Sequence, residues 1–318
     1  MTVPALPDDA DRLLRSTAGP YEPLGVHSRN RAGQPAVWEV RTGDGRRMFA
    51  KRPKNELMHR RETAAYRGLV PALGPGRAPT LLAEDVRSLL LVTATLPGTP
   101  VISAALSAAE ECEVYRQAGL LAARIHAHPI ADGVFGKRLP WSQERERALA
   151  RARDAQLSKG DVKVLAEATR AELPKTAIAT CHGDCGPRNW LVCRSGDGRL
   201  FVGVIDFERS QVKEPVRRDL MRVMLQLTPH RPDLRTAFLT GYGRDLTTAE
   251  QAACRAWAAI DCPAALRWPS TTTTTKRLSD TPASSWNSYA APQRPSETSL
   301  RSTILEVAPW KAFARQWP

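Results

Sequence analysis

The sequence predicts an α+β protein with two lobes, the first a small antiparallel sheet with one helix and the second larger and mainly helical. Three observations support this prediction. The chain has 318 residues, enough for about two domains. β-prone segments are concentrated between Tyr21 and Val92, and amphipathic stretches dominate from Pro97 to Cys262. We therefore expect a first lobe over residues 1–96, a second lobe over residues 97–262 and a separate tail over residues 263–318.

The first lobe is predicted from three β-prone segments and one capped helix. The segments are Ala36–Val40, Arg47–Lys51 and Leu89–Val92. The Gly-rich turn at residues 42–45 joins the first two segments into a hairpin. Asn55 can cap a helix that runs to about Leu69 and that Pro71 ends. These elements together predict a small sheet that carries one helix.

The second lobe is predicted to be helical around one inserted hairpin. Its amphipathic stretches are residues 103–127, 142–156, 160–173, 215–227, 233–242 and 247–262. Two short apolar runs, Trp190–Cys193 and Leu200–Ile205, flank a Gly-rich turn at residues 195–198. A second hairpin is therefore expected inside the helical lobe.

The chain carries a net charge of +13, from 46 Lys and Arg against 33 Asp and Glu. Such a balance raises the question of a nucleic-acid or anionic-lipid partner. The arginines are scattered over most segments, and no basic stripe has interleaved aromatic residues. We therefore expect no nucleic-acid partner.

Cysteine usage and the N-terminal sequence indicate a cytoplasmic protein without a membrane span. The six cysteines form no CxxC pair and no zinc-like cluster with histidine, which is typical of reduced thiols. The start, MTVPALPDDADRLL, lacks the basic and apolar parts of a signal peptide. Pro97, Gly98 and Pro100 interrupt the uncharged run at residues 88–109, which predicts a strand, a turn and a helix start.

The tail from Pro263 differs in composition from the rest of the chain. It is rich in Pro and Ser, has no helical or strand period, and contains five consecutive threonines at residues 271–275. A run of ACC codons shifted by one position encodes histidine, so one hypothesis is a changed reading frame. The alternative is an irregularly folded tail that covers the lobe with its tryptophans, Trp268, Trp286, Trp310 and Trp317.

Two motifs carry the chemistry of the sequence. They are HGDCGPRN at residues 182–189 and VIDFE at residues 204–208. Phosphoryl transfer needs a carboxylate for the acceptor hydroxyl and oxygen ligands that hold magnesium on the phosphates. Asp184 and Asn189, five residues apart, and Asp206 at the end of an apolar strand supply such groups. The two motifs therefore predict a phosphoryl-transfer site.

These motifs resemble the catalytic loop and the metal-binding segment of the aminoglycoside phosphotransferases, which share the two-lobed protein-kinase-like fold. The resemblance also includes FAKR at residues 49–52, RETAAY at 61–66, LLLVTATLPG at 89–98 and LLAARIHAH at 120–128. It spans about Tyr21 to Cys262. The resemblance implies that residues 1–96 bind a nucleotide and that residues 97–262 carry catalysis and bind the acceptor.

The resemblance also implies roles for single residues. Asp184 would be the catalytic base, and Asn189 and Asp206 would hold Mg²⁺. Lys51 would contact the α- and β-phosphates of ATP or GTP, and Glu62 would orient Lys51. Two alternatives stay open at this stage, because Lys51 could be a solvated surface charge and Glu62 could pair with neighbouring arginines on the surface of its helix.

Further residues are expected around this set. His182 would hold backbone carbonyls of the loop, and Asp219 would brace that loop from a helix. The phosphate-covering loop is expected at residues 28–35, with Ser28 as its candidate. Arg188 could face solvent or the phosphates. A hinge whose backbone meets the adenine is expected at Thr93, Ala94 and Thr95.

The function expected from these residues is a magnesium-requiring, ATP- or GTP-dependent phosphotransferase that modifies a hydroxyl of a small molecule such as an antibiotic. One alternative is a metabolic kinase for a choline-, sugar- or amino-alcohol-like acceptor. Another is a nucleotide-binding pseudokinase, against which the intact set of polar residues argues. Carboxylates that could hold a polycation are few, so a less charged acceptor is also compatible with the sequence. We expect a monomer or a dimer.

Overall fold

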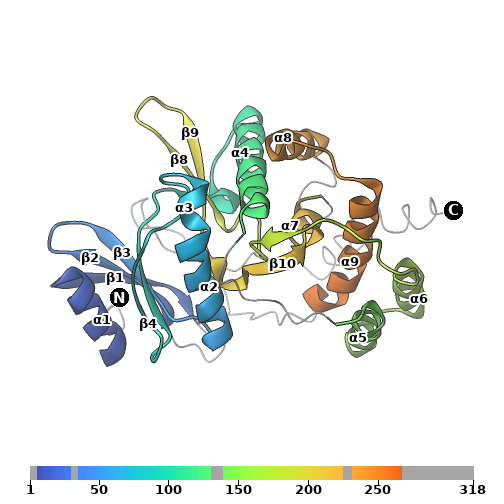
Figure 1. Ribbon diagram of the computed structural model, residues 1–318, viewed down its shortest axis with the longest axis horizontal. Coiled ribbons are helices and arrows are strands. Elements are labelled where there is room, and N and C mark those ends of the chain that lie inside the picture. The colour runs from blue at the N-terminus through green and yellow to red at the C-terminus, as the bar shows by residue number, and fades with distance from the viewer. Residues whose placement is uncertain (1–5, 30–34, 130–138, 225–230, 267–318) are drawn as a thin grey trace, which may run out of the picture. The chain divides into compact units, whose positions relative to one another are not determined.

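The computed structural model describes residues 6–29, 35–129, 139–224 and 231–266 (Figure 1). The chain divides into two compact units, which we describe separately. The first comprises Met1–Arg138 and Pro174–Arg255, and the second comprises Leu139–Leu173 and Ala256–Pro318. The lobe boundary predicted at residues 96 and 97 falls within the first unit and stays a prediction. Most of the predicted tail lies outside the described residues.

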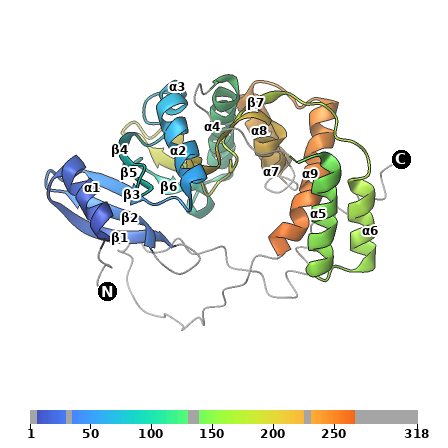
Figure 2. The ribbon, with the colours of Figure 1, turned by 60° about the horizontal axis from the view of Figure 1, so that its bottom comes forward.

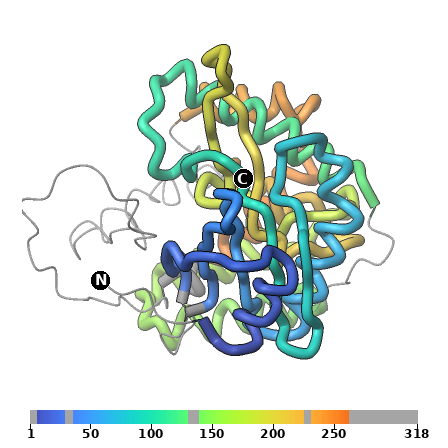
Figure 3. The backbone as a smooth tube through the Cα atoms, turned by 90° about the vertical axis from the view of Figure 1, so that its left-hand side faces the viewer, coloured from blue at the N-terminus to red at the C-terminus, as the bar shows by residue number. Residues whose placement is uncertain are grey.

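A five-stranded antiparallel sheet forms the N-terminal part of the first unit, and Figure 3 views the unit from the side of this sheet. The strand order is β1-β2-β3-β5-β4. The strands are β1 (Tyr21–Arg29), β2 (Pro35–Thr42), β3 (Arg47–Lys51), β4 (Leu81–Asp85) and β5 (Leu90–Ala94). The hairpin predicted around residues 42–45 is present, and it pairs Val37 with Lys51.

The alternation of side chains along β3 directs its residues to opposite faces of the sheet. Met48 and Ala50 belong to the hydrophobic core on one face, which also contains Trp38. Helix α1 (Asp8–Ala18) covers this face with Ala10 and Leu14. Lys51, one position after Ala50, therefore points to the other face.

Helix α2 (Glu56–Gly68) lies on the face of the sheet to which Lys51 points. The predicted cap is present, because the Asn55 side chain accepts a hydrogen bond of 3.0 Å from the Met58 backbone N–H. Pro71 does not end α2 directly. The helix stops at Gly68, and Pro71 lies at the start of the short helix α3 (Val70–Leu73).

The rest of the first unit combines helices with two small sheets. The elements are β6 (Thr99–Pro100), the 3₁₀ helix η1 (Val101–Ser103), α4 (Ala108–Ala127), β7 (Ile178–Cys181), β8 (Trp190–Arg194), β9 (Leu200–Val204), the 3₁₀ helix η2 (Phe207–Arg209), β10 (Gln211–Pro215), α7 (Arg217–Arg222), α8 (Pro232–Tyr242) and the start of α9 (Thr248–Leu266). The hairpin predicted inside the helical lobe is formed by β8 and β9. The helix expected from Ser103 begins only after Ser107, where a capping box with Glu110 is present.

Helices α4 and α8 approach each other closely through two glycines. A Cβ atom on Gly119 of α4 would overlap the carbonyl oxygen of Phe238 in α8. A Cβ atom on Gly241 of α8 would likewise overlap the carbonyl oxygen of Arg116 in α4. Any larger residue at either position would therefore force the two backbones apart.

The second unit contains three helical segments that pack together. Figure 2 shows α5 (Trp141–Asp154), α6 (Lys159–Ala168) and the later part of α9 side by side. Their core is formed by Ala148, Ala152, Leu165, Ala259 and Ile260. Helix α6 ends at Ala168, five residues before the predicted end, and α9 runs to Leu266, four residues beyond the predicted end. None of the described helices is long and apolar enough to cross a membrane.

Candidate active site

Lys51 is the centre of a cluster of charged side chains. Its ammonium nitrogen lies 2.9 Å from Oε2 of Glu62 on α2, 2.5 Å from Oδ1 of Asp206 and 3.2 Å from Oε2 of Glu208. Burial lowers the pKa of Lys51, but the three carboxylates outweigh burial and raise it well above its ordinary value. The lysine is therefore held as a cation, and the pairing of Lys51 with Glu62 agrees with the arrangement expected from the sequence.

Glu62 is almost completely buried, with 1% of its side chain exposed. Burial raises its pKa to about 7, with a contribution from Asp206 and Glu208, although Lys51 acts in the opposite direction. The carboxylate oxygens of Glu62, Asp206 and Glu208 lie within 4.8 Å of one another. Such hard oxygen donors are those that Mg²⁺ prefers, so the chemistry of this cluster fits the predicted metal.

Asp206 reaches the cluster because the backbone turns sharply after β9. Its φ angle is 69°, in the left-handed region, which is uncommon for a residue other than glycine. The preceding Ile205 N–H donates a hydrogen bond of 2.9 Å to the carbonyl oxygen of Asn189, which ties this turn to the loop at residues 182–189. Burial raises the pKa of Asp206, but the charge of Lys51 outweighs it, and the net shift is downward.

The loop at residues 182–189 is anchored by Asp219 of α7. The carboxylate of Asp219 accepts two backbone hydrogen bonds of 2.7 Å, from the N–H groups of His182 and Gly183. Gly183 has φ = 82°, and a Cβ atom there would overlap the carbonyl oxygen of Arg209. The loop conformation thus requires glycine at this position.

The His182 ring connects the loop at residues 182–189 to the turn before Asp206. Its Nδ1 accepts a hydrogen bond of 3.2 Å from the Asp184 backbone N–H, and its Nε2 lies 3.0 Å from the carbonyl oxygen of Ile205. These partners place a ring proton on Nε2, where it can be donated to the carbonyl oxygen of Ile205. This arrangement agrees with the structural role expected for His182.

Asp184 is buried, with 3% of its side chain exposed, and two arginines hold its carboxylate. Arg188, from the same loop, pairs with Oδ2, and Arg222, from α7, pairs with Oδ1. Burial raises the pKa of Asp184, but the guanidinium groups of Arg222 and Arg188 lower it to about 2. The carboxylate is therefore ionised at any physiological pH.

Asn189 has an orientation fixed by the same loop. Its side-chain nitrogen donates a hydrogen bond of 2.9 Å to the carbonyl oxygen of Asp184. Because this bond uses the amide NH₂, the amide oxygen points away from that carbonyl, as a metal ligand would need.

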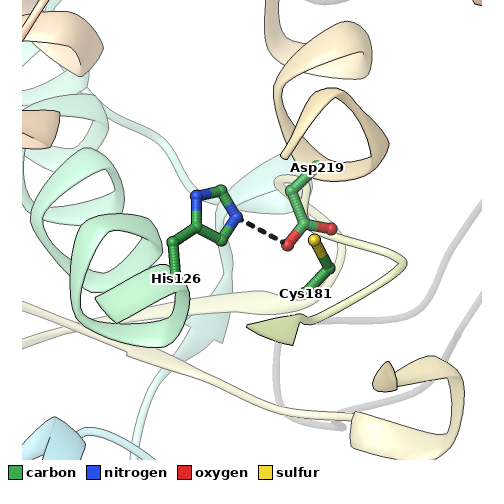
Figure 4. Close-up of side chains that lie close together, drawn as sticks. All are labelled: His126, Cys181 and Asp219. Carbon is green, nitrogen blue, oxygen red and sulfur yellow. Dashed lines mark hydrogen bonds and ion pairs between the residues drawn. The ribbon is translucent and has the colours of Figure 1, made fainter. Parts of the chain in front are cut away.

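His126, Cys181 and Asp219 form a second cluster (Figure 4). His126 of α4 directs Nε2 to Oδ2 of Asp219 at 3.2 Å, and its Nδ1 lies 2.8 Å from the Tyr242 hydroxyl. Cys181 lies close to both side chains, and burial raises its pKa well above the ordinary value. Since both oxygens of Asp219 already accept hydrogen bonds from backbone N–H groups, this cluster is explained by support of the loop at residues 182–189.

The predicted nucleotide contacts outside the lysine cluster are only partly described. Ser28 lies exposed near the end of β1, opposite Val37, and residues 30–34 of the expected phosphate loop lie outside the described residues. In the expected hinge, Ala94 N–H donates to the carbonyl oxygen of Thr80 at 2.9 Å, and Thr95 N–H donates to that of Arg47 at 3.2 Å. These two N–H groups are already hydrogen-bonded, and Thr93 is paired with Phe49 and Leu81 within the sheet. The hinge contact to adenine therefore stays a prediction.

Sequence reasoning did not assign roles to two residues that the structure places at the site. Arg222 follows Asp219 by three residues on one helix, so helical spacing could have shown that both face the loop. His126 is part of the LLAARIHAH segment, but the sequence alone gives no sign of its partner.

Known families and solved structures include several that are similar to this chain. Residues 28–257 match the model of the phosphotransferase enzyme family. The streptomycin-ATP-APH(2")-IIa ternary complex is 16% identical with a TM-score of 0.56, over 82% of this chain and 92% of that chain. An aminoglycoside-3'-phosphotransferase of type VIII is 24% identical with a TM-score of 0.54, over 80% of this chain and 98% of that chain.

A choline/ethanolamine kinase family protein from Mesorhizobium loti is 19% identical with a TM-score of 0.54, over 81% of this chain and 83% of that chain. A search of curated proteins finds no match. At these identities the solved structures show the fold, and they confirm the predicted α+β, protein-kinase-like class.

Proposed function

The chain belongs to the phosphotransferase enzyme family, and from that premise we propose that it transfers the γ-phosphoryl group of ATP or GTP to a hydroxyl of a small molecule. The observation that carries the proposal is the convergence of Lys51, Glu62 and Asp206 in one cluster, tied through Ile205 and Asn189 to the loop of Asp184. A pseudokinase would have no need of this complete set.

The residues of the chain take distinct parts in the proposed reaction. Lys51, oriented by Glu62, contacts the α- and β-phosphates. Asn189 and Asp206 hold Mg²⁺, which neutralises charge on the phosphates when it is bound. Asp184 orients the acceptor hydroxyl toward the γ-phosphorus.

In the transfer, a bond forms between the acceptor oxygen and the γ-phosphorus, and the bond from that phosphorus to the β–γ bridging oxygen breaks. The nucleoside diphosphate leaves with that oxygen. The hydroxyl proton passes to Asp184 and then to solvent. Because the pKa of Asp184 is about 2, this carboxylate is a weak base. We therefore infer that the proton moves late, after bond formation to phosphorus has acidified the hydroxyl.

The acceptor is to be sought among hydroxylated antibiotics, such as those named with the structural neighbours, and among metabolites such as choline. We further propose a cytoplasmic enzyme, a monomer or dimer that binds no nucleic acid. The free cysteines among the described residues, which include buried Cys181, Cys185 and Cys254, agree with a reducing compartment.

The test is a screen of the purified full chain with Mg-ATP and Mg-GTP against a panel of both acceptor types. Release of nucleoside diphosphate and mass detection of an added phosphate identify a substrate. Asp184→Ala should reduce turnover by about 100-fold or more and should still bind nucleotide, because Asp184 acts on the acceptor. Turnover above about a tenth of that of the native chain would show that Asp184 is not the group that handles the hydroxyl.

A further inference from the structure

The charged side chains in direct contact with Lys51 differ in sign from those in direct contact with Asp184. Lys51 forms ion pairs with three carboxylates, those of Glu62, Asp206 and Glu208. When all are ionised, they leave two negative charges after Lys51 is neutralised. A divalent cation compensates such a charge. This side of the site therefore suits the metal and the nucleotide.

The side chains in direct contact with Asp184 are basic. Its single carboxylate faces the guanidinium groups of Arg188 and Arg222, which leaves one positive charge. Arg209 of η2 also lowers the pKa of Asp184 by its charge. The carboxylate predicted to meet the acceptor hydroxyl is thus paired directly with two cations, and the charge of Arg209 also acts on it.

Each guanidinium has capacity for a second anion. Arg222 pairs with Asp184 through Nη1 and Arg188 through Nη2, while a guanidinium carries five N–H donors on three nitrogens. The side chains are 31% and 57% exposed, so both reach solvent. Planar guanidinium groups bind carboxylates and phosphates in bidentate fashion.

Arg222 is the better placed of the two for an acceptor. Arg188 directly precedes Asn189, the predicted metal ligand, and so belongs to the loop that serves the phosphates. Arg222 comes from α7, a different element, and contacts the other oxygen of Asp184. An anion that binds Arg222 would compete with Asp184 for the guanidinium and release Oδ1 to accept the hydroxyl hydrogen bond.

Resting on the proposed function, we propose that the acceptor carries a carboxylate or a phosphate monoester near the hydroxyl that is phosphorylated, and that Arg222 binds this group. A polycationic acceptor would instead meet like charge around Asp184. Arg222 is then a specificity-determining residue that recognises the acceptor and frees the catalytic carboxylate.

The experiment uses the full chain with Mg-ATP and Mg-GTP and acceptors in matched pairs. Glycerate with glycerol and gluconate with glucose test a carboxylate, glucose 6-phosphate with glucose tests a phosphate monoester, and kanamycin represents a polycation. Binding to the nucleotide-loaded protein is measured by calorimetry and transfer by mass detection. We expect the anionic member of at least one pair to bind and react with kcat/KM about tenfold or more above its neutral partner.

Variants of Arg222 separate recognition from chemistry. In Arg222→Gln, the KM for the anionic acceptor should rise about tenfold, and its advantage over the neutral partner should disappear. Arg222→Lys keeps the charge and should restore part of the preference. Arg199→Gln is the matched control, because Arg199 lies in the β8–β9 turn with 86% of its side chain exposed. Thermal unfolding of each variant reports whether it is folded.

Three results would overturn the inference while the proposed function stands. One is preference for a neutral or polycationic acceptor. Another is nucleotide binding without binding or reaction of any anionic compound. The third is an equal loss of kcat for both members of a pair in Arg222→Gln, which would mean that Arg222 acts on the transferred phosphoryl group. Failure to bind any nucleotide would instead contradict the proposed function itself.

Discussion

The ammonium of Lys51 lies 2.5 Å from the carboxylate of Asp206, although 155 positions separate the two residues in the chain. One partner ends β3 and the other follows β9, so this ion pair joins the N-terminal sheet to the catalytic loop region. Glu62 completes the contact from α2. Three distant segments of sequence thus meet at one charged nitrogen.

Lys51→Met should raise the KM for nucleotide and lower kcat, each by about tenfold or more, because the phosphates lose their cationic contact. Steady-state kinetics with varied Mg-ATP and Mg-GTP measure both constants. Lys163→Met is the matched control, since Lys163 on α6 has 77% of its side chain exposed. An unchanged KM in Lys51→Met would mean that the lysine serves only the fold.

Asp206→Ala should weaken magnesium-dependent nucleotide binding more than Asn189→Ala does. A charged carboxylate contributes more to a Mg²⁺ site than a neutral amide oxygen, so we expect about a tenfold difference in nucleotide affinity at limiting Mg²⁺. Calorimetric titration across a range of Mg²⁺ concentrations measures the difference. Equal losses in the two variants would contradict this metal site.

The kcat/KM for nucleotide should rise with pH up to about 7 and then level off. Glu62, whose pKa is about 7, must be ionised to pair with Lys51, and kcat/KM reports the ionisation of the free enzyme. In Glu62→Gln this rise should disappear. A pH profile that is the same in both proteins would assign the ionisation to another group.

The raised pKa of Glu62 also makes the stability of the folded protein depend on pH. A carboxyl group whose folded pKa is raised above its ordinary value favours the folded state at low pH and loses that contribution as pH rises. Between the ordinary value of 4.5 and about 7, Glu62 should therefore make the native protein less stable with increasing pH. Thermal unfolding of Glu62→Gln across this interval should show a weaker decline than that of the native chain.

Gly183→Ala should destabilise the protein more than Gly198→Ala. The two glycines have similar φ angles of 82° and 80°. Each substitution therefore carries the same cost of placing alanine in a left-handed conformation, about 1–2 kcal/mol. At Gly183 the added Cβ also overlaps Arg209, whereas Gly198 has open space. Urea denaturation should show an additional loss of about 1–3 kcal/mol for Gly183→Ala. Equal losses would show that the loop can move to accept a side chain.

Local signals in the sequence predicted much of this fold. The Gly-rich turn at residues 42–45 and the cap at Asn55 act over a few residues, and the structure confirms both. Helix α4 begins at Ala108, five residues after the start predicted at Ser103, although Ser103 and Ser107 can both cap a helix. Only Ser107 has glutamate three residues later, and that capping box decides the start.

Long-range contacts account for what the sequence did not reveal. Helix α1 has a short apolar face, and its burial depends on a core that includes Trp38, which no local pattern connects to it. The pairing of Arg222 with Asp184 likewise joins two elements 38 positions apart. Helix α9 continues through Pro263 to Leu266, although a proline inside a helix removes a backbone hydrogen bond, and the local composition did not indicate this continuation.

The contact between α4 and α8 has a consequence for how this chain can diverge. Because Gly119 and Gly241 each face a backbone carbonyl of the other helix, a substitution at one position displaces the segment that carries the other. Helix α4 also carries His126, which supports Asp219, so such a displacement would be transmitted to the loop at residues 182–189. Among related chains the residues at these two positions should therefore covary, with small residues retained or exchanged at both together.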